Sequence, residues 1–529
     1  MKNFLLSLFL AVTAFVRAAA PVTPPVTTRP FPFAEATIGQ LQQRMQAGTL
    51  TARDLAIAYL ERIESMDRRG PALRSVIEIN PEALDIAARL DAERKAGKVR
   101  GPLHGIPILI KDNIATADRM ETTAGSLALV GSKPPRDAHI VTRLRDAGAV
   151  ILGKTNLSEW ANFRSTDSTS GWSGRGGLTR NPYALDRTPS GSSSGSAVAV
   201  AANFCVVAIG TETDGSVVSP ASHTGIVGFK PTVGLVSRTG IIPIAASQDT
   251  AGPMARTVRD AAIVLGVLAG VDPADAATQK RPADFTADFD SGRSPLRGAR
   301  IGILRGPFGF RVKVDHVLDA MEEVLMDAGA ELVDLGEYPA LAEIRGHEVE
   351  VFYYELKAGL NAYLATLGPD VPYKTLADLI AFNRTHPNEE MPWFGQEHFL
   401  RAEAKGPLTD PVYLAARAKS LQLARTEALD AWLDGQQLDA VVSITAGPAA
   451  IVDLVFGGMM RGGGSSTLAA VAGYPSVTVP AAQIAGLPVG ISFTGRAWSD
   501  AKLLALAADF EARTQARREP RYLPTAEAK

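Results

Sequence analysis

The sequence predicts an α/β fold in which a mixed central β-sheet is flanked by α-helices. Residues 301–304, 314–328 and 331–335 alternate between strand, helix and strand patterns, which is typical of this fold class. Residues 106–110 form a continuous apolar run, which favours a strand buried on both faces. Although 529 residues exceed the usual length of one domain, no linker or charge run divides the chain after residue 35. We therefore predict a single large domain over residues 36–529.

The N-terminal segment differs in composition from the rest of the chain. Lys2 precedes an apolar run over residues 4–16, and Ala18-Ala19-Ala20 supplies the small residues that signal peptidase reads. The run is too short to span a bilayer comfortably. We therefore expect a signal peptide over residues 1–20 and an exported protein, periplasmic or secreted, without stable membrane insertion. An uncleaved N-terminal anchor is the alternative. Residues 21–35 are rich in proline and predict an extended tether.

Charge and composition argue against several classes of partner and cofactor. The net charge is −2 and the isoelectric point is near 6.4, so nothing favours binding to nucleic acid or to an anionic membrane. Cys205 is the only cysteine, which excludes an internal disulfide and a thiolate metal cluster. The seven histidines lie far apart in the sequence. We therefore expect no metal and no other cofactor.

The N-terminal part of the domain contains predicted helices, one strand and a loop. Apolar residues at helical spacing predict helices over 38–45, 52–66 and 82–95, and Thr51 can cap the second of these. A helix over 137–147 leads into a strand over 149–152. Residues 157–181 are polar and rich in glycine, so they predict a long loop near a site. Trp160 and Trp172 lie in this loop, and Trp172 is a candidate for substrate contact.

The C-terminal half continues the pattern of helices and strands. Thr257 can cap a helix that runs to residue 269. Residues 340–435 are mostly helical and carry no catalytic signature, so we expect a helical layer that covers the sheet and selects the substrate. The late strands are predicted over 438–444, 476–479 and 489–493, and a closing helix over 500–513.

Residues 148–155 match the pattern of a phosphate-binding loop, with two glycines, four residues between them, and a following Lys-Thr. Such a loop needs successive backbone N–H groups that curl around phosphate after a strand. Here the four middle residues read as a strand themselves. We therefore do not expect nucleotide binding at this segment.

The segment Gly191-Ser-Ser-Ser-Gly195 matches the nucleophile elbow of α/β-hydrolases, with Ser193 at its centre. That interpretation predicts an esterase, which needs an acid and then a histidine downstream. His223 follows the elbow too closely, and the preceding residues 181–189 read as an irregular loop and not as a strand. An esterase that uses Ser193 is therefore kept only as an alternative.

A second interpretation combines Lys111 with Ser192 and Ser216. Gly215 allows the chain to turn after the strand over 206–209, so that several N–H groups face one point and form an oxyanion hole. The backbone groups of this oxyanion hole belong to Thr213, Asp214, Gly215 and Ser216. A serine without a histidine can be activated by a neutral lysine through an intermediate hydroxyl. Lys111 ends a buried strand, where desolvation lowers the pKa of an amine, unless it emerges into water.

Five motifs at family-like spacing make the chain resemble the amidase signature family. They are Gly105-Ile-Pro-Ile-Leu-Ile-Lys-Asp-Asn113, Gly148-Ala-Val-Ile-Leu-Gly-Lys-Thr-Asn156, Gly191-Ser-Ser-Ser-Gly-Ser-Ala197, Gly210-Thr-Glu-Thr-Asp-Gly-Ser216 and Gly228-Phe-Lys-Pro-Thr-Val-Gly234. The resemblance extends to residues 473–475 and 486–490, so it covers almost all of the chain after the signal peptide. It implies the amidase signature fold for residues 36–529.

The resemblance also implies roles for individual residues. Ser216 corresponds to the nucleophile, Ser192 to the serine after a non-proline cis peptide bond, and Lys111 to the general base. Ser192 is then expected to pass the proton of Ser216 to Lys111 and to return it to the leaving ammonia. Ser193 is expected to support Lys111 through a hydrogen bond.

Residues 157–163, the triple serine and Thr-Glu-Thr-Asp-Gly-Ser most resemble the bacterial peptide amidases, which hydrolyse the C-terminal carboxamide of peptides to acid and ammonia. The resemblance therefore implies a peptide or small-molecule amide as substrate and a monomeric enzyme. Amino-acid, aryl or fatty amides are alternative substrates. A role like that of the amidase subunit of a tRNA amidotransferase is opposed by the export signal, because charged tRNA and ATP are cytoplasmic.

The sequence departs from the family pattern at several positions. Asp214 replaces a usual glycine, Val218 stands where arginine is frequent, and Ser492 stands where many members carry glutamine. Ser190-Gly-Ser-Ser-Ser194-Gly replaces the common Gly-Gly-Ser-Ser-Gly-Gly. These changes bear on the substrate and not on the chemistry. The side chain of Asp214 either contacts the amide nitrogen of the ligand or caps the following turn.

Overall fold

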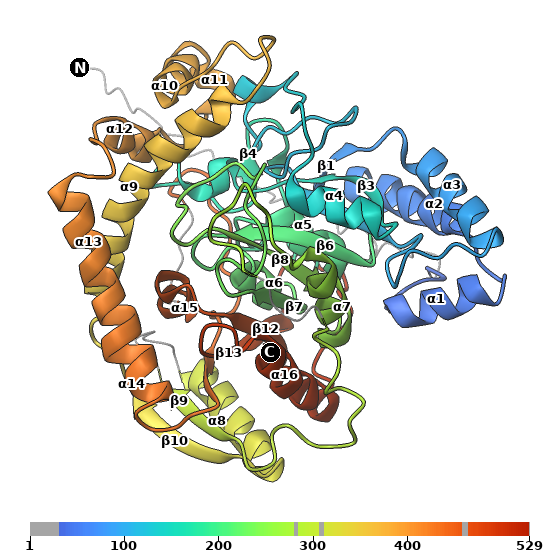
Figure 1. Ribbon diagram of the computed structural model, residues 1–529, viewed down its shortest axis with the longest axis vertical. Coiled ribbons are helices and arrows are strands. Elements are labelled where there is room, and N and C mark those ends of the chain that lie inside the picture. The colour runs from blue at the N-terminus through green and yellow to red at the C-terminus, as the bar shows by residue number, and fades with distance from the viewer. Residues whose placement is uncertain (1–30, 280–283, 306–311, 458–463, 528–529) are drawn as a thin grey trace, which may run out of the picture.

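A mixed sheet of eleven strands runs through the centre of the computed structural model, which describes residues 31–279, 284–305, 312–457 and 464–527 (Figure 1). The strand order is β1-β3-β2-β6-β8-β7-β12-β13-β11-β9-β10. Helices flank the sheet, so the predicted α/β fold with a mixed central sheet is confirmed.

The strands are short, and their bounds agree with the predicted segments to within a few residues where a strand was predicted. They are β1 (Val76–Ile79), β2 (Pro107–Lys111), β3 (Val150–Thr155), β6 (Val207–Glu212), β7 (Val227–Lys230), β8 (Thr250–Ala255), β9 (Arg300–Leu304), β10 (Glu331–Gly336), β11 (Ala440–Ile444), β12 (Ser476–Ile484) and β13 (Leu487–Thr494). Two further strands, β4 (Trp172–Ser173) and β5 (Gly177–Leu178), form a separate small sheet within the predicted loop. The sequence pattern did not predict β1, β7 or β8.

The pairing of β2 places Lys111 beside the segment that follows β6. It is parallel to both of its neighbours, β3 and β6, and all five of its residues are buried, as the apolar run predicted. Ile110 pairs with Ile209 in β6. Because parallel strands end at the same edge of a sheet, this register brings Lys111 next to the residues that follow Ile209. Residues 150–155 of the phosphate-loop pattern are strand β3, which confirms that this segment does not curl.

Helices pack on both faces and at the ends of the sheet. They are α1 (Ile38–Gln46), α2 (Ala52–Arg62) with its π-helical continuation over Ile63–Arg68, α3 (Ala83–Lys95), α4 (His139–Asp146), α5 (Ser194–Ala201), α6 (Val218–His223), α7 (Val258–Leu268), α8 (Val312–Asp327), α15 (Ser466–Ala472) and α16 (Asp500–Thr514). The predicted caps are present: the hydroxyl oxygen of Thr51 accepts from the N–H of Asp54, and that of Thr257 accepts from the N–H of Asp260.

Residues 341–433 are mostly helical, as the sequence predicted for the covering region. It comprises α9 (Leu341–Ala365), α10 (Leu376–Thr385), α11 (Pro387–Glu390), α12 (Glu397–Glu403), α13 (Pro411–Leu421), a π-helix over Gln422–Asp430 and α14 (Ala431–Leu433). Figure 1 shows these elements in yellow and orange along one side of the molecule, with α9 and α13 lying alongside each other.

The start of the described chain corrects one expectation. Residues 1–30, which hold the predicted signal peptide and most of the predicted tether, lie outside the described residues. Residues 32–35 form a turn, Phe31 and Phe33 pack against Tyr59, and Glu35 forms an ion pair of 2.6 Å with Arg517. The last part of the expected tether is therefore packed on the domain and is not extended.

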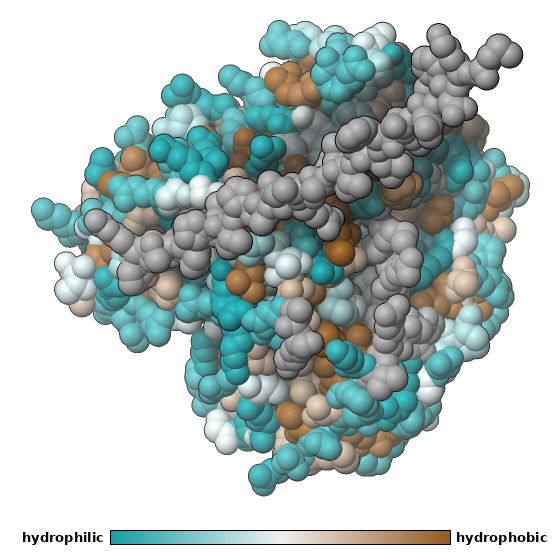
Figure 2. Space-filling model, turned by 180° about the vertical axis from the view of Figure 1, so that it is seen from behind, coloured by the Kyte–Doolittle hydropathy of each residue, from teal (hydrophilic) through white to brown (hydrophobic). Residues whose placement is uncertain are grey.

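The surface opposite to the view of Figure 1 is mostly hydrophilic, and its hydrophobic side chains lie in small separate groups (Figure 2). In the described ranges, no helix combines the length and the apolar character needed to cross a bilayer.

We predict that the cap of α7 contributes measurably to stability. Thr257→Ala should lower the free energy of unfolding by about 1 kcal/mol, because the N–H of Asp260 loses its acceptor. Thr257→Ser keeps a hydroxyl at the same position and serves as the control. Chemical denaturation of the two variants and the parent protein measures the difference, and equal stability of all three would contradict the prediction.

Candidate active site

Three segments that are distant in the sequence meet at the end of β2. Lys111 closes this strand, Ser192 and Ser193 precede α5, and Ser216 follows β6. The N–H of Ser193 donates to the carbonyl oxygen of Ser216 at 3.1 Å, which joins the two serine segments directly. The peptide bond between Gly191 and Ser192 is cis, as the family resemblance implied.

Lys111 is fully buried, and the described groups that its amine contacts are uncharged. Its Nζ lies 2.7 Å from Ser192 Oγ, 3.1 Å from Ser193 Oγ and 2.9 Å from Thr211 Oγ1, with the carbonyl oxygen of Thr211 at 3.2 Å. Burial lowers the pKa of Lys111 to about 7, although the charges of Asp249 and Glu212 oppose this shift. A substantial fraction of the amine is therefore neutral near neutral pH and has a lone pair that can accept a proton.

The hydrogen bonds of Ser193 are all used in holding Lys111 and Thr211. Its Oγ donates to the carbonyl oxygen of Thr211 at 3.0 Å and accepts from the backbone N–H of Thr211 at 3.1 Å as well as from Lys111. Its side chain is also fully buried. Ser193 therefore cannot present a free hydroxyl to a substrate, which argues against the esterase interpretation. The expected hydrogen bond between Ser193 and Lys111 is present.

Ser192 differs from Ser193 in that its hydroxyl has one hydrogen-bond partner among the described side chains, the amine of Lys111. Its proton is therefore not committed to a backbone acceptor within the described residues. This arrangement allows Ser192 to donate its proton to neutral Lys111 while it accepts another from a neighbouring hydroxyl.

Ser216 lies on the wall of a cavity of about 500 Å³, together with the turn that precedes it. Gly215 has a φ of +77°, and a side chain there would come within 2.9 Å of Ser466 Oγ, so the turn requires glycine. The backbone N–H groups of the turn donate to no acceptor within the described ranges. These donors belong to Thr213, Asp214, Gly215 and Ser216, and they are the groups expected to form the oxyanion hole.

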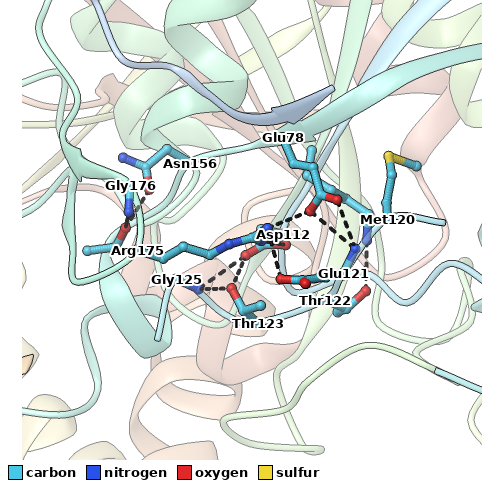
Figure 3. A network of polar contacts seen from close by, with 12 residues as sticks. Glu78, Asp112, Met120, Glu121, Thr122, Thr123, Gly125, Asn156, Arg175 and Gly176 are labelled. Carbon is cyan, nitrogen blue, oxygen red and sulfur yellow. Dashed lines mark hydrogen bonds and ion pairs between the residues drawn. The ribbon is translucent and has the colours of Figure 1, made fainter. Parts of the chain in front are cut away.

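A network of ion pairs anchors the residue next to Lys111 (Figure 3). Asp112 is buried and accepts from the hydroxyl of Thr123, and Arg175 Nη1 lies 3.5 Å from its other carboxylate oxygen. Arg175 also pairs with Glu78 at 2.6 Å and with Glu121 at 3.0 Å. Figure 3 shows Arg175 extending between these acidic side chains. The network ties the loop over 157–181 to the ends of β1 and β2, and so holds Lys111 in place.

Of the two predicted substrate contacts, Trp172 and Asp214, one lines the cavity. Trp172 is buried, lies edge-to-face against Phe394 and has the guanidinium of Arg164 over its ring. It is not among the described residues that line the cavity, so nothing in the structure supports direct contact with a ligand. Asp214 does line the cavity.

Asp214 does not cap the following turn. Its Oδ2 accepts from the hydroxyl of Thr467 at 2.8 Å, whereas Glu212 Oε2 accepts from the N–H groups of Val217 and Val218 at 2.7 and 3.0 Å. Glu212 therefore performs the capping role that was considered for Asp214.

His223 and Glu348 are two of the residues that line the cavity but were not predicted from the sequence. His223 lies on α6, and its Nδ1 donates to the carbonyl oxygen of Ser219 at 2.9 Å. Burial lowers the pKa of His223, so it is neutral near pH 7. Glu348 reaches the cavity from α9, in the covering region. No motif marks either residue, and their positions follow only from how α6 and α9 pack.

The sequence and fold of this chain are similar to those of known amidases. A family model described as Amidase matches residues 54–504. A peptide amidase structure in complex with the competitive inhibitor chymostatin is 54% identical, with a TM-score of 0.89 and coverage of 93% of this chain and 100% of that one. The native peptide amidase from Stenotrophomonas maltophilia is also 54% identical, with a TM-score of 0.88 and coverage of 93% and 99%. A probable amidase of Arabidopsis thaliana is 40% identical over 506 residues, which cover 93% of each chain.

The fold and these likenesses define an enzyme that hydrolyses amides. More particularly, the chain belongs to the amidase family, since the family model matches most of its length.

We predict that the titration of Lys111 governs the acid limb of activity. Because only the neutral amine can accept a proton and its pKa is about 7, kcat/KM for amide hydrolysis should rise as the pH increases through this value. Lys111→Arg should lower kcat/KM by about 10²-fold to 10⁴-fold, since the guanidinium stays protonated. Initial rates between about pH 5 and about pH 9 measure the profile. A flat profile in the parent enzyme, or full activity of the arginine variant, would contradict the assignment.

Proposed function

We propose that this protein hydrolyses primary amides, in particular the C-terminal carboxamide of peptides, to a carboxylic acid and ammonia. The observation that carries the proposal is the contact of 2.7 Å between the buried amine of Lys111 and Ser192 Oγ, beside a cavity that Ser216 lines. This contact provides a base and a hydroxyl relay without a histidine.

The reaction follows from these positions. The oxygen of Ser216 attacks the amide carbon as its proton passes to Ser192, while the proton of Ser192 passes to Lys111. The resulting oxyanion receives hydrogen bonds from the free N–H groups of the turn over 213–216. When the C–N bond breaks, the proton returns through Ser192 to the leaving ammonia. Water then attacks the ester on Ser216 by the same route, which releases the acid and restores the serine.

Three further observations support a peptide substrate. The cavity volume of about 500 Å³ is in the range of about 300–1,000 Å³ that is usual for small-molecule sites. Apolar side chains, including Phe163, Ile244 and Phe352, share its wall with the polar turn, as suits a substrate with side chains beside the reacting amide. The likeness to peptide amidases at 54% identity points to the same substrate class.

We predict that Ser216 is the nucleophile. Ser216→Ala should lower the rate of amide hydrolysis by about 10⁴-fold or more, because the proposed mechanism loses the hydroxyl that forms the acyl-enzyme. Ser193→Ala is the comparison, and it should retain more activity because Ser193 only supports Lys111. Ammonia release is measured in both variants, with circular dichroism as a check on folding. If Ser193→Ala is inactive while Ser216→Ala retains activity, the esterase-type nucleophile is correct instead.

We predict that peptide amides are the preferred substrates. Ammonia release should be faster from peptides that end in a carboxamide than from free amino-acid amides, aryl amides or fatty amides at equal concentration. A peptide with a C-terminal N-methylamide and otherwise the same sequence is the matched control for the primary amide. Turnover of the other amides alone would contradict the peptide assignment and leave the amidase chemistry intact.

A further inference from the structure

Two carboxyl groups from different parts of the chain meet on the wall of the cavity that contains Ser216. Asp214 belongs to the turn that follows β6, and Glu348 belongs to α9. Glu348 is 3% exposed, and its Oε1 accepts from Gln248 Nε2 at 2.8 Å. The same amide group of Gln248 lies 3.2 Å from the carbonyl oxygen of Thr213. Glu348 is therefore linked through Gln248 to Thr213, the residue that precedes Asp214 in the turn.

The hydrogen bonds of Asp214 are incomplete if both carboxyl groups are ionised. Thr467 donates to Oδ2, but Oδ1 is buried and has no donor among the described groups. A carboxylate accepts hydrogen bonds and cannot donate one, so ionised Glu348 could not satisfy this atom. A protonated Glu348 could, because its O–H would donate to Oδ1. One proton between the two groups thus accounts for the unpartnered oxygen.

The surrounding charges favour this proton. Burial raises the pKa of Glu348 well above its usual range, and the neighbouring Asp214 raises it further through its charge and a hydrogen bond. Arg345, on the same helix, opposes the shift. Two further ionisable groups interact with Asp214 through their charge: Glu212 on β6 and Lys230 on β7. Their charges have opposite signs. Burial and the charge of Asp214 therefore raise the pKa of Glu348 by more than Arg345 lowers it.

We propose that Glu348 is a positioning residue that, in its protonated form, donates a hydrogen bond to Asp214 and so fixes the turn over 213–216. This inference rests on the proposed function of that turn as the oxyanion hole. Since Asp214 is itself part of the turn, a donor from α9 that holds its side chain also holds the N–H groups aimed at the cavity. The covering region thereby contributes to the chemistry and does not merely enclose the substrate.

The proposal has a defined pH dependence. While Glu348 is protonated, the hydrogen bond is present and the turn is held. As the pH rises through the raised pKa of Glu348, its proton is lost, the donor disappears and a second negative charge faces Asp214. Because the oxyanion forms only during the reaction, kcat should fall on this alkaline limb more than KM changes.

The test compares Glu348→Gln, Glu348→Ala and the control Glu343→Gln, a change at an exposed position on the same helix. The amide of glutamine can donate to Asp214 and accept from Gln248 without carrying a titrating proton. Glu348→Gln should therefore keep kcat within about threefold and move the alkaline limb to higher pH, whereas Glu348→Ala should lower kcat by about 10²-fold, the effect of losing an oxyanion-hole donor. The control should match the parent enzyme.

A second readout does not depend on the substrate. The rate at which a fluorophosphonate probe labels Ser216 also depends on a developing oxyanion, so Glu348→Ala should slow labelling and Glu348→Gln should not. If the parent enzyme hydrolyses no amide, the proposed function fails, and the labelling rates alone decide the role of Glu348. If Glu348→Ala does not fold, the glutamine variant decides. A loss of kcat and of labelling in Glu348→Gln, or an alkaline limb that does not move, would overturn the proposal.

Discussion

The site depends on the burial of one amine among uncharged partners. Among the described residues, the groups that contact the amine of Lys111 are hydroxyls and a carbonyl, and the carboxyl groups of Asp249 and Glu212 act on it through their charge. A carboxylate in direct contact would keep the amine protonated and useless as a base. The parallel pairing of β2 with β3 and β6, with every residue of β2 buried, creates this environment.

Charged groups are nevertheless close by, and they hold the surrounding loops. Arg175 joins the acidic groups next to Lys111, and a fully buried ion pair of 2.7 Å links Arg164 with Glu159 in the same loop. Arg164 also donates to backbone carbonyls of Glu390 and Gly395, in the covering region. The cavity is lined by the turn over 213–216, by α9 and by part of the loop over 157–181, and these buried charges tie that loop to the covering region.

Local signals in the sequence were enough to predict the elements that carry the proposed catalytic residues. The apolar run of β2 placed Lys111 at the end of a buried strand, the glycine-rich turn placed Ser216, and the small-residue helix placed Ser192 and Ser193. The loop context of Trp172 was a less reliable signal. Trp172 was a candidate for substrate contact because it stands in a polar loop, yet it packs against Phe394 beneath Arg164. An aromatic residue in a loop carries no information about which way it faces.

The sequence by itself determined the α/β class, the capped helices, the buried strand of Lys111 and the residue types of the proposed triad, because each depends on neighbours within one segment. Only the tertiary structure decided the order of the sheet, the strands β1, β7 and β8, which are short, and the meeting of Asp214 with Glu348. Those features depend on contacts between segments that are not adjacent in the sequence, where no local pattern specifies register or proximity. The two serine clusters could be recognised from their turns, but their connection through the N–H of Ser193 and the carbonyl of Ser216 required the folded chain.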